Sequence, residues 1–239
     1  RTLQALYPDT TYHAESGGDP EVIPDLTQEK FIGFHKKYYH PSNSYIFLYG
    51  DMDIDAKLKF LDEEYLSHFT RVPVESAIQK QPLFSGLRRV VSEYPVGAED
   101  STAEKTFLSL NMIVGDAEDT LTVMGLYILE HALLRTEAAP LRQALIDAGI
   151  GKDISSSFEP SLRQPYLSIV AQNAEPDRVD RFYEVIRTTL TKLVKEGIDR
   201  TLLQASINFM EFRLREADFR QYPKGLIYNI NIMNSWLYD

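Results

Sequence analysis

Residues 119–151, DTLTVMGLYILEHALLRTEAAPLRQALIDAGIG, hold the strongest helix signal in a chain of 239 residues. The first part of this stretch is the most apolar helical pattern in the sequence. A shorter helix is predicted from Pro140 to Ala148, and it ends at Gly149 because glycine readily adopts the backbone conformation that closes a helix. The rest of the chain is expected to be organised around this pair of helices.

The same stretch contains the only constellation that looks like metal chemistry: Tyr127, Glu130 and His131. In the H-x-x-E-H motif, positions i and i+4 share one helix face, so two imidazoles bind one zinc ion while the glutamate activates water. Tyr127 stands where the first histidine belongs, and a phenol with a pKa near ~10 replaces a neutral imidazole poorly. We interpret the motif as a degenerate copy and predict neither metal ligands nor catalytic residues in this chain.

Composition narrows the classes of partner. Apolar residues make up 44% of the chain and charged residues 25%, which is ordinary for a globular protein. The net charge of −10 argues against nucleic acid, since a binder needs clustered Lys and Arg to replace counterions on phosphate. The chain has no cysteine, which excludes thiolate zinc sites, and no apolar run approaches membrane-spanning length. We therefore expect no nucleic-acid partner and no membrane partner.

The segment before residue 70 predicts two helices around a strand. Thr27 is a helix N-cap and Pro41 stops the helix that it begins. The apolar face of this helix consists of Phe31, Phe34 and Tyr38. A short aromatic strand is predicted at residues 44–51, and a second helix at residues 54–69.

The segment after residue 70 begins with the best linker candidate, TRVPVESAIQKQPLFS at residues 70–85, which holds two prolines and lacks periodicity. Strands are predicted beyond it at residues 87–94, 106–114, 154–158 and 166–171. Further helices are predicted at residues 178–196, at 200–216 and from 222 onward. The predicted fold class is α+β.

Three stretches of the chain carry a resemblance to a known family. They are LYPDTTYHAESGGDPEVIPDLTQEKFIGFHKKYYHPSNSYIFLYGD at 6–51, LLRTEAAPLRQALIDAGIG at 133–151 and EGIDRTLLQASINFMEFRLREADFRQYPKGL at 196–226. Together they resemble the insulinase-like (pitrilysin) zinc metallopeptidases, and within them the presequence protease and falcilysin subgroup. The match runs in the same order over nearly the whole chain.

This resemblance implies processing-peptidase-like domains, each with a mixed, mostly antiparallel sheet flanked by helices. Four such domains enclose a chamber in the family, and the first one holds the zinc ion. The resemblance places residues 1–70 at the end of the catalytic-type first domain, 71–85 in a linker and 86–239 in most of the second, inactive domain. The chain opens on Arg1 rather than Met, so we expect it to be part of a longer protein whose zinc motif lies upstream.

A second departure from the family pattern supports an inactive domain. The segment LRQALIDAG at 141–149 resembles one that, in the family's last domain, supplies an Arg and a Tyr to the transition state. Arg142 is present, but Ala148 and Gly149 stand where the Tyr is expected.

The family's substrate-tethering strand follows this segment, which places it at residues 151–158 of this chain. The candidate peptide-binding residues are Asp153, Ile154, Ser155, Ser156 and Ser157. Small side chains suit this role because backbone hydrogen bonds supply most of the affinity when a peptide adds to a sheet edge. The alternative is a plain edge strand without a ligand.

The resemblance implies part of a zinc endopeptidase that degrades short unstructured peptides, such as cleaved targeting sequences. Zinc would then be the cofactor of the full-length parent and not of this region. The expected partners are peptide substrates and the remaining domains of the same chain, in the cytoplasm of a bacterium or in the mitochondrial matrix or plastid of a eukaryote. The alternatives are a non-catalytic scaffold or binding subunit of processing-peptidase type and, less favoured, a small zinc enzyme using Glu130 and His131.

Overall fold

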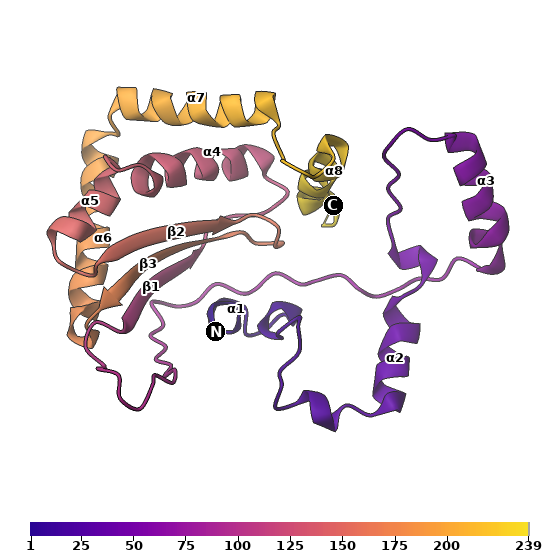
Figure 1. Ribbon diagram of the computed structural model, residues 1–239, viewed down its shortest axis with the longest axis horizontal. Helices are drawn as coiled ribbons and strands as arrows, with labels where there is room; N and C mark the ends of the chain where they lie inside the picture. The colour runs from indigo at the N-terminus through magenta and orange to yellow at the C-terminus, as the bar shows by residue number, and fades with distance from the viewer. Residues whose placement is uncertain (239) are drawn as a thin grey trace.

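The computed structural model describes residues 1–238 and has at its centre a three-stranded antiparallel sheet (Figure 1). Its strands are β1 (Thr106–Ile113), β2 (Asp153–Glu159) and β3 (Tyr166–Ala174), in the order β1-β3-β2. They confirm the strands predicted at 106–114, 154–158 and 166–171. β3 is the central strand, and β1 and β2 are the two edges.

Eight α-helices are described in residues 1–238. They are α1 (Thr2–Leu6), α2 (Gln28–Tyr38), α3 (Ile54–Glu64), α4 (Thr120–Glu130), α5 (Pro140–Asp147), α6 (Val179–Glu196), α7 (Arg200–Glu216) and α8 (Lys224–Trp236). A π-helical segment, η5 (His131–Arg135), continues α4. The predicted helices are confirmed, although α3 ends before the predicted residue 69. Thr27 caps α2 by accepting the amide of Lys30, and α6 ends at Gly197, whose φ is 87°.

The hydrophobic core lies between one face of the sheet and the helices α5 and α6. In the sheet, Leu108 of β1 lies opposite Ala171 of β3, which lies opposite Ile154 of β2. These three side chains share a face because residues directly across a ladder point the same way. They pack with the buried residues Leu141, Leu145, Ile150, Phe182 and Ile186. The helix α4 lies along the edge strand β2, and α7 lies over α4 (Figure 1).

Two predicted strands are wrong. Residues 44–51 and 87–94 form no helix or strand, and neither pairs with another strand in residues 1–238. An extended segment becomes a strand only when a neighbour bonds its backbone groups, and a local sequence pattern cannot show whether such a neighbour is present. At residues 44–51 the apolar side chains that suggested a strand remain exposed, with Tyr45 at 66% and Ile46 at 50%.

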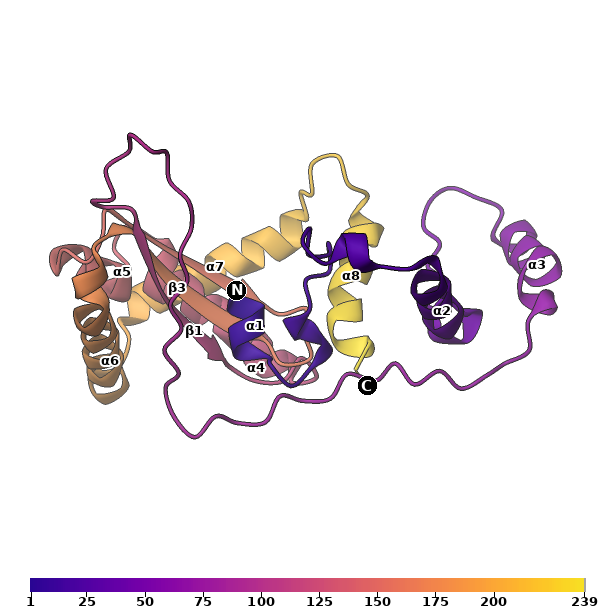
Figure 2. The same ribbon diagram turned by 90° about the horizontal axis from the view of Figure 1, so that it is seen from below.

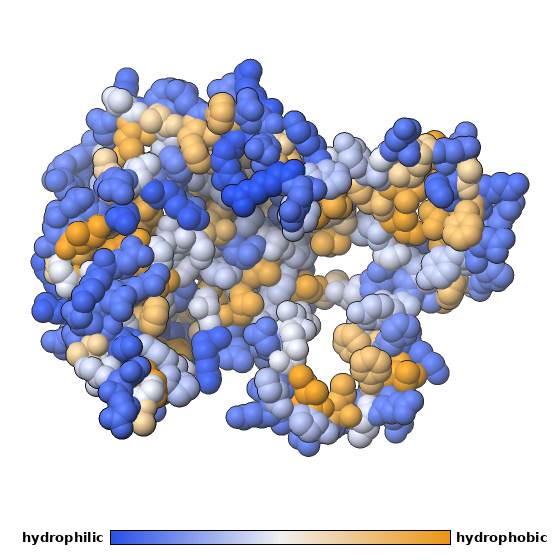
Figure 3. All heavy atoms as spheres, viewed as in Figure 1, coloured by the Kyte–Doolittle hydropathy of each residue, from blue (hydrophilic) through white to orange (hydrophobic). Residues whose placement is uncertain are grey.

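Residues 28–69, which we call the arm, project away from the sheet (Figures 1 and 2). Neither α2 nor α3 contains a buried residue. The predicted apolar face of α2 is correspondingly open: Phe31 and Phe34 are each 59% exposed. Figure 3 shows the resulting apolar patches on this part of the molecule. The ring of Tyr49 packs so closely on Gly225 of α8 that a Cβ there would overlap it.

The predicted linker at residues 70–85 has no helix or strand, and its second half makes hydrogen bonds to other parts of the molecule. The side chain of Gln81 is buried. It accepts a hydrogen bond from the backbone amide of Asp9 at 2.9 Å and donates one to the Asp9 carboxylate at 2.6 Å. Its backbone amide donates to the side chain of Gln164 in the turn between β2 and β3. Tyr7 is fully buried beside it and donates to the carbonyl of Gln164.

Candidate functional site

Glu130 is the buried carboxylate at the point where α4 gives way to the π-helical turn η5. Only 6% of the residue is exposed. Its Oε1 accepts a hydrogen bond from Ser156 Oγ of β2 at 2.8 Å and another from Arg135 Nε at 2.9 Å. A buried charge is tolerated only when it is paired and hydrogen-bonded, so this carboxylate ties the helix to the edge strand.

His131, the next residue, turns to a different element. Its Nδ1 lies 3.0 Å from Ser206 Oγ of α7, and that hydroxyl donates its one hydrogen to the carbonyl of Leu202. Ser206 Oγ must therefore accept, which places a proton on Nδ1 of His131. The imidazole is stacked on Phe209, with ring centroids 4.3 Å apart. Burial lowers the pKa of His131, and the neighbouring Glu130 opposes that shift.

Tyr127, which replaces the first histidine of the motif, packs against the sheet. Its ring meets the ring of Phe158 edge-on, with the centroids 4.8 Å apart and the planes at 90°. Burial raises the pKa of the Tyr127 hydroxyl. The phenol therefore stays protonated near neutral pH, which is the opposite of what a metal ligand requires.

The three motif residues thus contact three sets of protein partners and converge on no common point. No group of three or more His, Asp or Glu side chains within residues 1–238 could hold a metal ion. One imidazole and one carboxylate, both engaged by other side chains, do not fit a zinc ion that needs about three protein ligands. The absence of metal ligands here stays a prediction until it is measured.

Arg142, the remaining residue of the second degenerate segment, also has a partner. Its guanidinium lies 3.5 Å from the carboxylate of Asp153 at the start of β2. The neighbouring positions Ala148 and Gly149 close the end of α5, and Gly149 has a φ of 61°. No aromatic hydroxyl accompanies Arg142 in this segment.

The candidate peptide-binding residues 153–157 lie in β2, at one edge of the sheet. The amide of Val114 donates to the carbonyl of Pro165 at 2.9 Å, directly across the ladder between β1 and β3. Because backbone groups alternate sides along a strand, this bond fixes which residues of each strand bond inward. The β2 residues whose N–H and C=O groups point to the open edge are Ile154, Ser156 and Phe158. In β1, the residues whose N–H and C=O groups point away from β3 include Ser109 and Asn111.

The sheet face away from the core is lined by small polar side chains, a feature that the sequence interpretation missed. One row across the strands is Ser109, Val170 and Ser155, and the next is Asn111, Ser168 and Ser157. Ser168 Oγ donates to Asn111 Oδ1 at 2.7 Å. The alternation of Ser and Asn with apolar residues in β1 is the signal that could have revealed this face.

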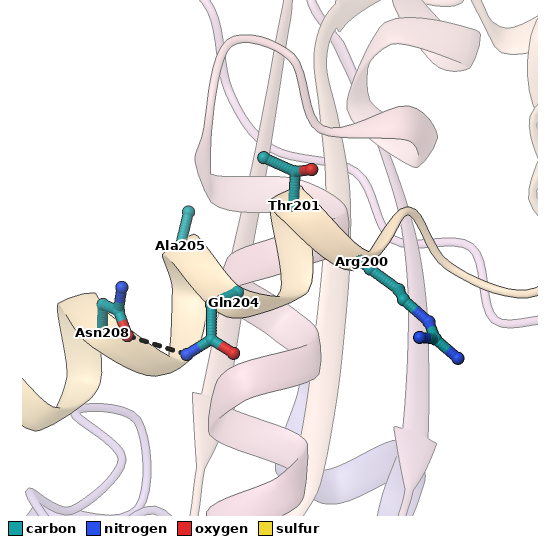
Figure 4. A pocket seen from close by; sticks show the side chains of 5 residues that line it. All are labelled: Arg200, Thr201, Gln204, Ala205 and Asn208. Atoms are coloured by element: carbon teal, nitrogen blue, oxygen red, sulfur yellow. Dashed lines mark hydrogen bonds between the residues drawn. The ribbon is translucent and has the colours of Figure 1, made fainter.

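A shallow surface hollow lies along α7 (Figure 4). It is lined by Arg200, Thr201, Gln204, Ala205 and Asn208. Gln204 donates to Asn208 at 2.9 Å, one helical turn away, as Figure 4 shows. The lining comes from one helix only and brings no group from another element to a ligand, so it forms no site.

The family of the chain follows from comparison with known proteins. The family model described as "Peptidase M16 inactive domain" matches residues 25–210. This chain belongs to that family. The family resemblance and the α+β fold predicted from the sequence are therefore confirmed.

Curated relatives of this M16 domain align with it along almost its whole length. Protein HypA of Clostridium perfringens is 47% identical over 236 residues, which are 99% of this chain and 24% of that protein. Presequence protease 1, chloroplastic/mitochondrial, of Arabidopsis thaliana is 40% identical over 240 residues, covering 99% of this chain and 22% of that protein. The mitochondrial presequence protease of Mus musculus is 30% identical over 239 residues, covering 98% and 23%. The chain thus spans about a quarter of the length of these relatives.

A solved structure supports the fold independently. An M16-like peptidase of Alicyclobacillus acidocaldarius superimposes on 92% of this chain and 51% of its own, with a TM-score of 0.55 and 18% sequence identity. At that identity the similarity establishes the fold alone.

No helix within residues 1–238 is long and apolar enough to cross a membrane.

A double-mutant cycle tests the bridge between Glu130 and Ser156. Ser156→Ala is expected to lower the unfolding free energy by about 1.5–3 kcal/mol, because it removes a hydrogen bond to a buried charge. Combined with Glu130→Gln, the loss should fall short of the sum of the single losses by about 1 kcal/mol. Urea denaturation provides the measurement.

The control Ser157→Ala, on the exposed side of the same strand, should change stability by less than about 0.5 kcal/mol. Strict additivity of Glu130→Gln and Ser156→Ala would show that the bridge contributes nothing.

The dependence of stability on pH tests the environment of His131. Its pKa is lowered from the ordinary value of 6.5 in the folded protein, so below that pH the unfolded chain binds a proton more readily. Stability should therefore be complete above pH 6.5 and decrease as the pH falls toward the folded pKa. Denaturation midpoints between pH 8 and 5 measure this. His131→Gln should flatten the dependence, whereas His35→Gln, at an exposed position of α2, should leave it intact; an unchanged slope in His131→Gln would contradict the assignment.

Proposed function

We propose that this chain is a non-catalytic region of a zinc endopeptidase that degrades short unstructured peptides, and that it forms part of the wall that holds the peptide. The match to an inactive peptidase domain supports this, together with relatives named as presequence proteases. The engagement of Glu130 and His131 by other side chains agrees with a region that does no chemistry of its own. Zinc, in this proposal, belongs to the full-length parent.

The arm supports the proposed division of the chain. We assign residues 1–70 to the end of a catalytic-type domain, 71–85 to a linker and 86–239 to an inactive domain. The aromatic residues Phe31, Phe34 and Phe47 are exposed on the arm, and a stable protein rarely leaves so much contiguous apolar surface in water. The proposed cover is the remainder of the same longer chain, so the partners of this region are its sibling domains and the peptide.

The edge strand β2 is the observation that carries the proposal of peptide binding. The backbone groups of Ile154, Ser156 and Phe158 point to the open edge, and no strand within residues 1–238 pairs with them. Such an edge accepts an extended peptide, whose backbone bonds supply affinity without demanding a particular sequence. The neighbouring side chains of Ser155 and Ser157 are small enough to let different peptides approach.

A non-catalytic scaffold or binding subunit of processing-peptidase type is the second candidate. It is favoured by the degenerate motif, which offers one imidazole and one carboxylate where a zinc site needs about three ligands. The two candidates differ in the parent protein: an endopeptidase cleaves an unstructured peptide in a zinc-dependent manner, and a scaffold subunit does not. The proposed compartment is the cytoplasm in a bacterium, or the mitochondrial matrix or plastid in a eukaryote, as the names of two relatives suggest.

Peptide titration of two variants at one position tests the binding edge. Ser156→Pro removes the amide that points outward, whereas Ser156→Ala keeps it. Both variants lose the hydrogen bond to Glu130, so any difference between them reports the backbone. Fluorescence anisotropy with a labelled, Arg-rich targeting-type peptide should show about tenfold weaker binding to Ser156→Pro than to Ser156→Ala. Equal affinity in the two folded variants would show that the outward backbone groups of β2 do not bind the peptide.

A further inference from the structure

A groove lies beside β1, at the opposite edge of the sheet from β2. It lies between the outer edge of β1 and residues 84–92 and has a volume of about 540 Å³, within the range of ligand-binding clefts. Residues 84–92 lead into the loop before β1, and they run beside β1 itself (Figure 2). Side chains of α1 and α6 also line the groove. The proposed function makes no use of this groove.

The β1 wall of the groove offers unpaired backbone groups. Ser109 and Asn111 point their N–H and C=O groups away from β3, and both residues line the groove. No strand within residues 1–238 bonds to this edge. An edge of this kind takes up an extended segment by continuing the ladder.

The opposite wall is held beside β1 by contacts near both of its ends. The hydroxyl of Tyr94 donates to the carbonyl of Lys105, and the Tyr94 ring packs on the ring of Phe107 with centroids 5.9 Å apart. Further along, Arg89 forms an ion pair with Asp180 of α6. These contacts hold residues 89–94 next to β1, and no strand is described within them.

The apolar and positively charged side chains that line the groove favour a ligand with apolar and acidic groups. Most of the lining is apolar and includes Leu6, Phe84, Leu87, Val90 and Phe182. Every charged side chain among the described lining residues is an arginine: Arg1, Arg88 and Arg89. Arg89 is paired with Asp180, but the guanidinium of Arg88 lies over the ring of Phe84 at 4.8 Å and has no carboxylate within ion-pair distance in residues 1–238. In a chain of net charge −10, this groove is locally positive.

We propose that the groove between β1 and residues 84–92 binds an extended peptide segment with alternating apolar and acidic side chains. The segment adds to the sheet through the backbone groups of Ser109 and Asn111. Its apolar side chains enter the groove between the two walls, and a carboxylate pairs with Arg88, whose planar fork matches a carboxylate in two hydrogen bonds. This site goes beyond the proposed function, because that function uses β2, at the opposite edge of the sheet.

Hydrogen exchange of the 239-residue chain tests the site with two defined probes. One is an acetylated six-residue peptide of alternating valine and glutamate, and the other replaces glutamate by lysine. The acidic probe should slow exchange of the amides of Ser109 and Asn111 at least about tenfold at saturation, as a new ladder bond does. The lysine probe should have no effect. The Arg-rich peptide used to test β2 should likewise leave the exchange of these two amides unchanged, which separates this site from the proposed one.

Matched variants test the two walls. Ser109→Pro removes an outward amide at an edge position where proline is tolerated, and Ser109→Ala keeps that amide. The acidic probe should bind Ser109→Pro about tenfold more weakly than Ser109→Ala, and Arg88→Gln about tenfold more weakly than the unaltered chain. Unchanged affinity in either weakened variant would overturn the proposal, as would equal effects of the two probes. Protection of residues 87–94 without any probe would also overturn it, because their own segment would then fill the edge.

Discussion

The buried carboxylate of Glu130 constrains the arrangement of the elements around it. A charge at this depth costs several kcal/mol unless hydrogen bonds satisfy it, and here the partners come from β2 and from the end of η5. The helix α4 must therefore stay in contact with the edge strand. Once α4 is placed, His131 faces Ser206 and Phe209, so the same helix end also positions α7.

The same constraint engages two residues of the peptidase-like motif. Glu130 and His131 keep the residue types that would activate water and bind zinc, but both side chains bond to protein groups. Tyr127 is also engaged within the protein, because its ring packs on Phe158 and its hydroxyl stays protonated. Residues with catalytic counterparts thus stabilise the contact between helix and sheet, as expected of an inactive domain of the M16 family.

Local patterns predicted the elements whose cause is local. Thr27 and Gly197 mark helix ends, and alternation in β1 and β3 marks strands, because caps and periodicity act within a few residues. Residues 44–51 and 87–94 have equally good strand patterns, yet neither has a partner strand within residues 1–238. A local pattern carries no information about whether such a partner is present. The site was predictable only as a departure from a motif: Ser156 and Ser206 lie 26 and 75 residues from the side chains they bond, and no spacing rule connects them.

Glu130 and His131 are both held by other side chains, and we expect neither to bind a metal ion. The most direct test restores the missing histidine with Tyr127→His and titrates the purified variant with zinc by isothermal calorimetry. Because Ser156 and Arg135 hold Glu130 and Ser206 holds His131, we expect no stoichiometric binding. One zinc ion per chain, lost again when His131→Ala is added, would contradict it.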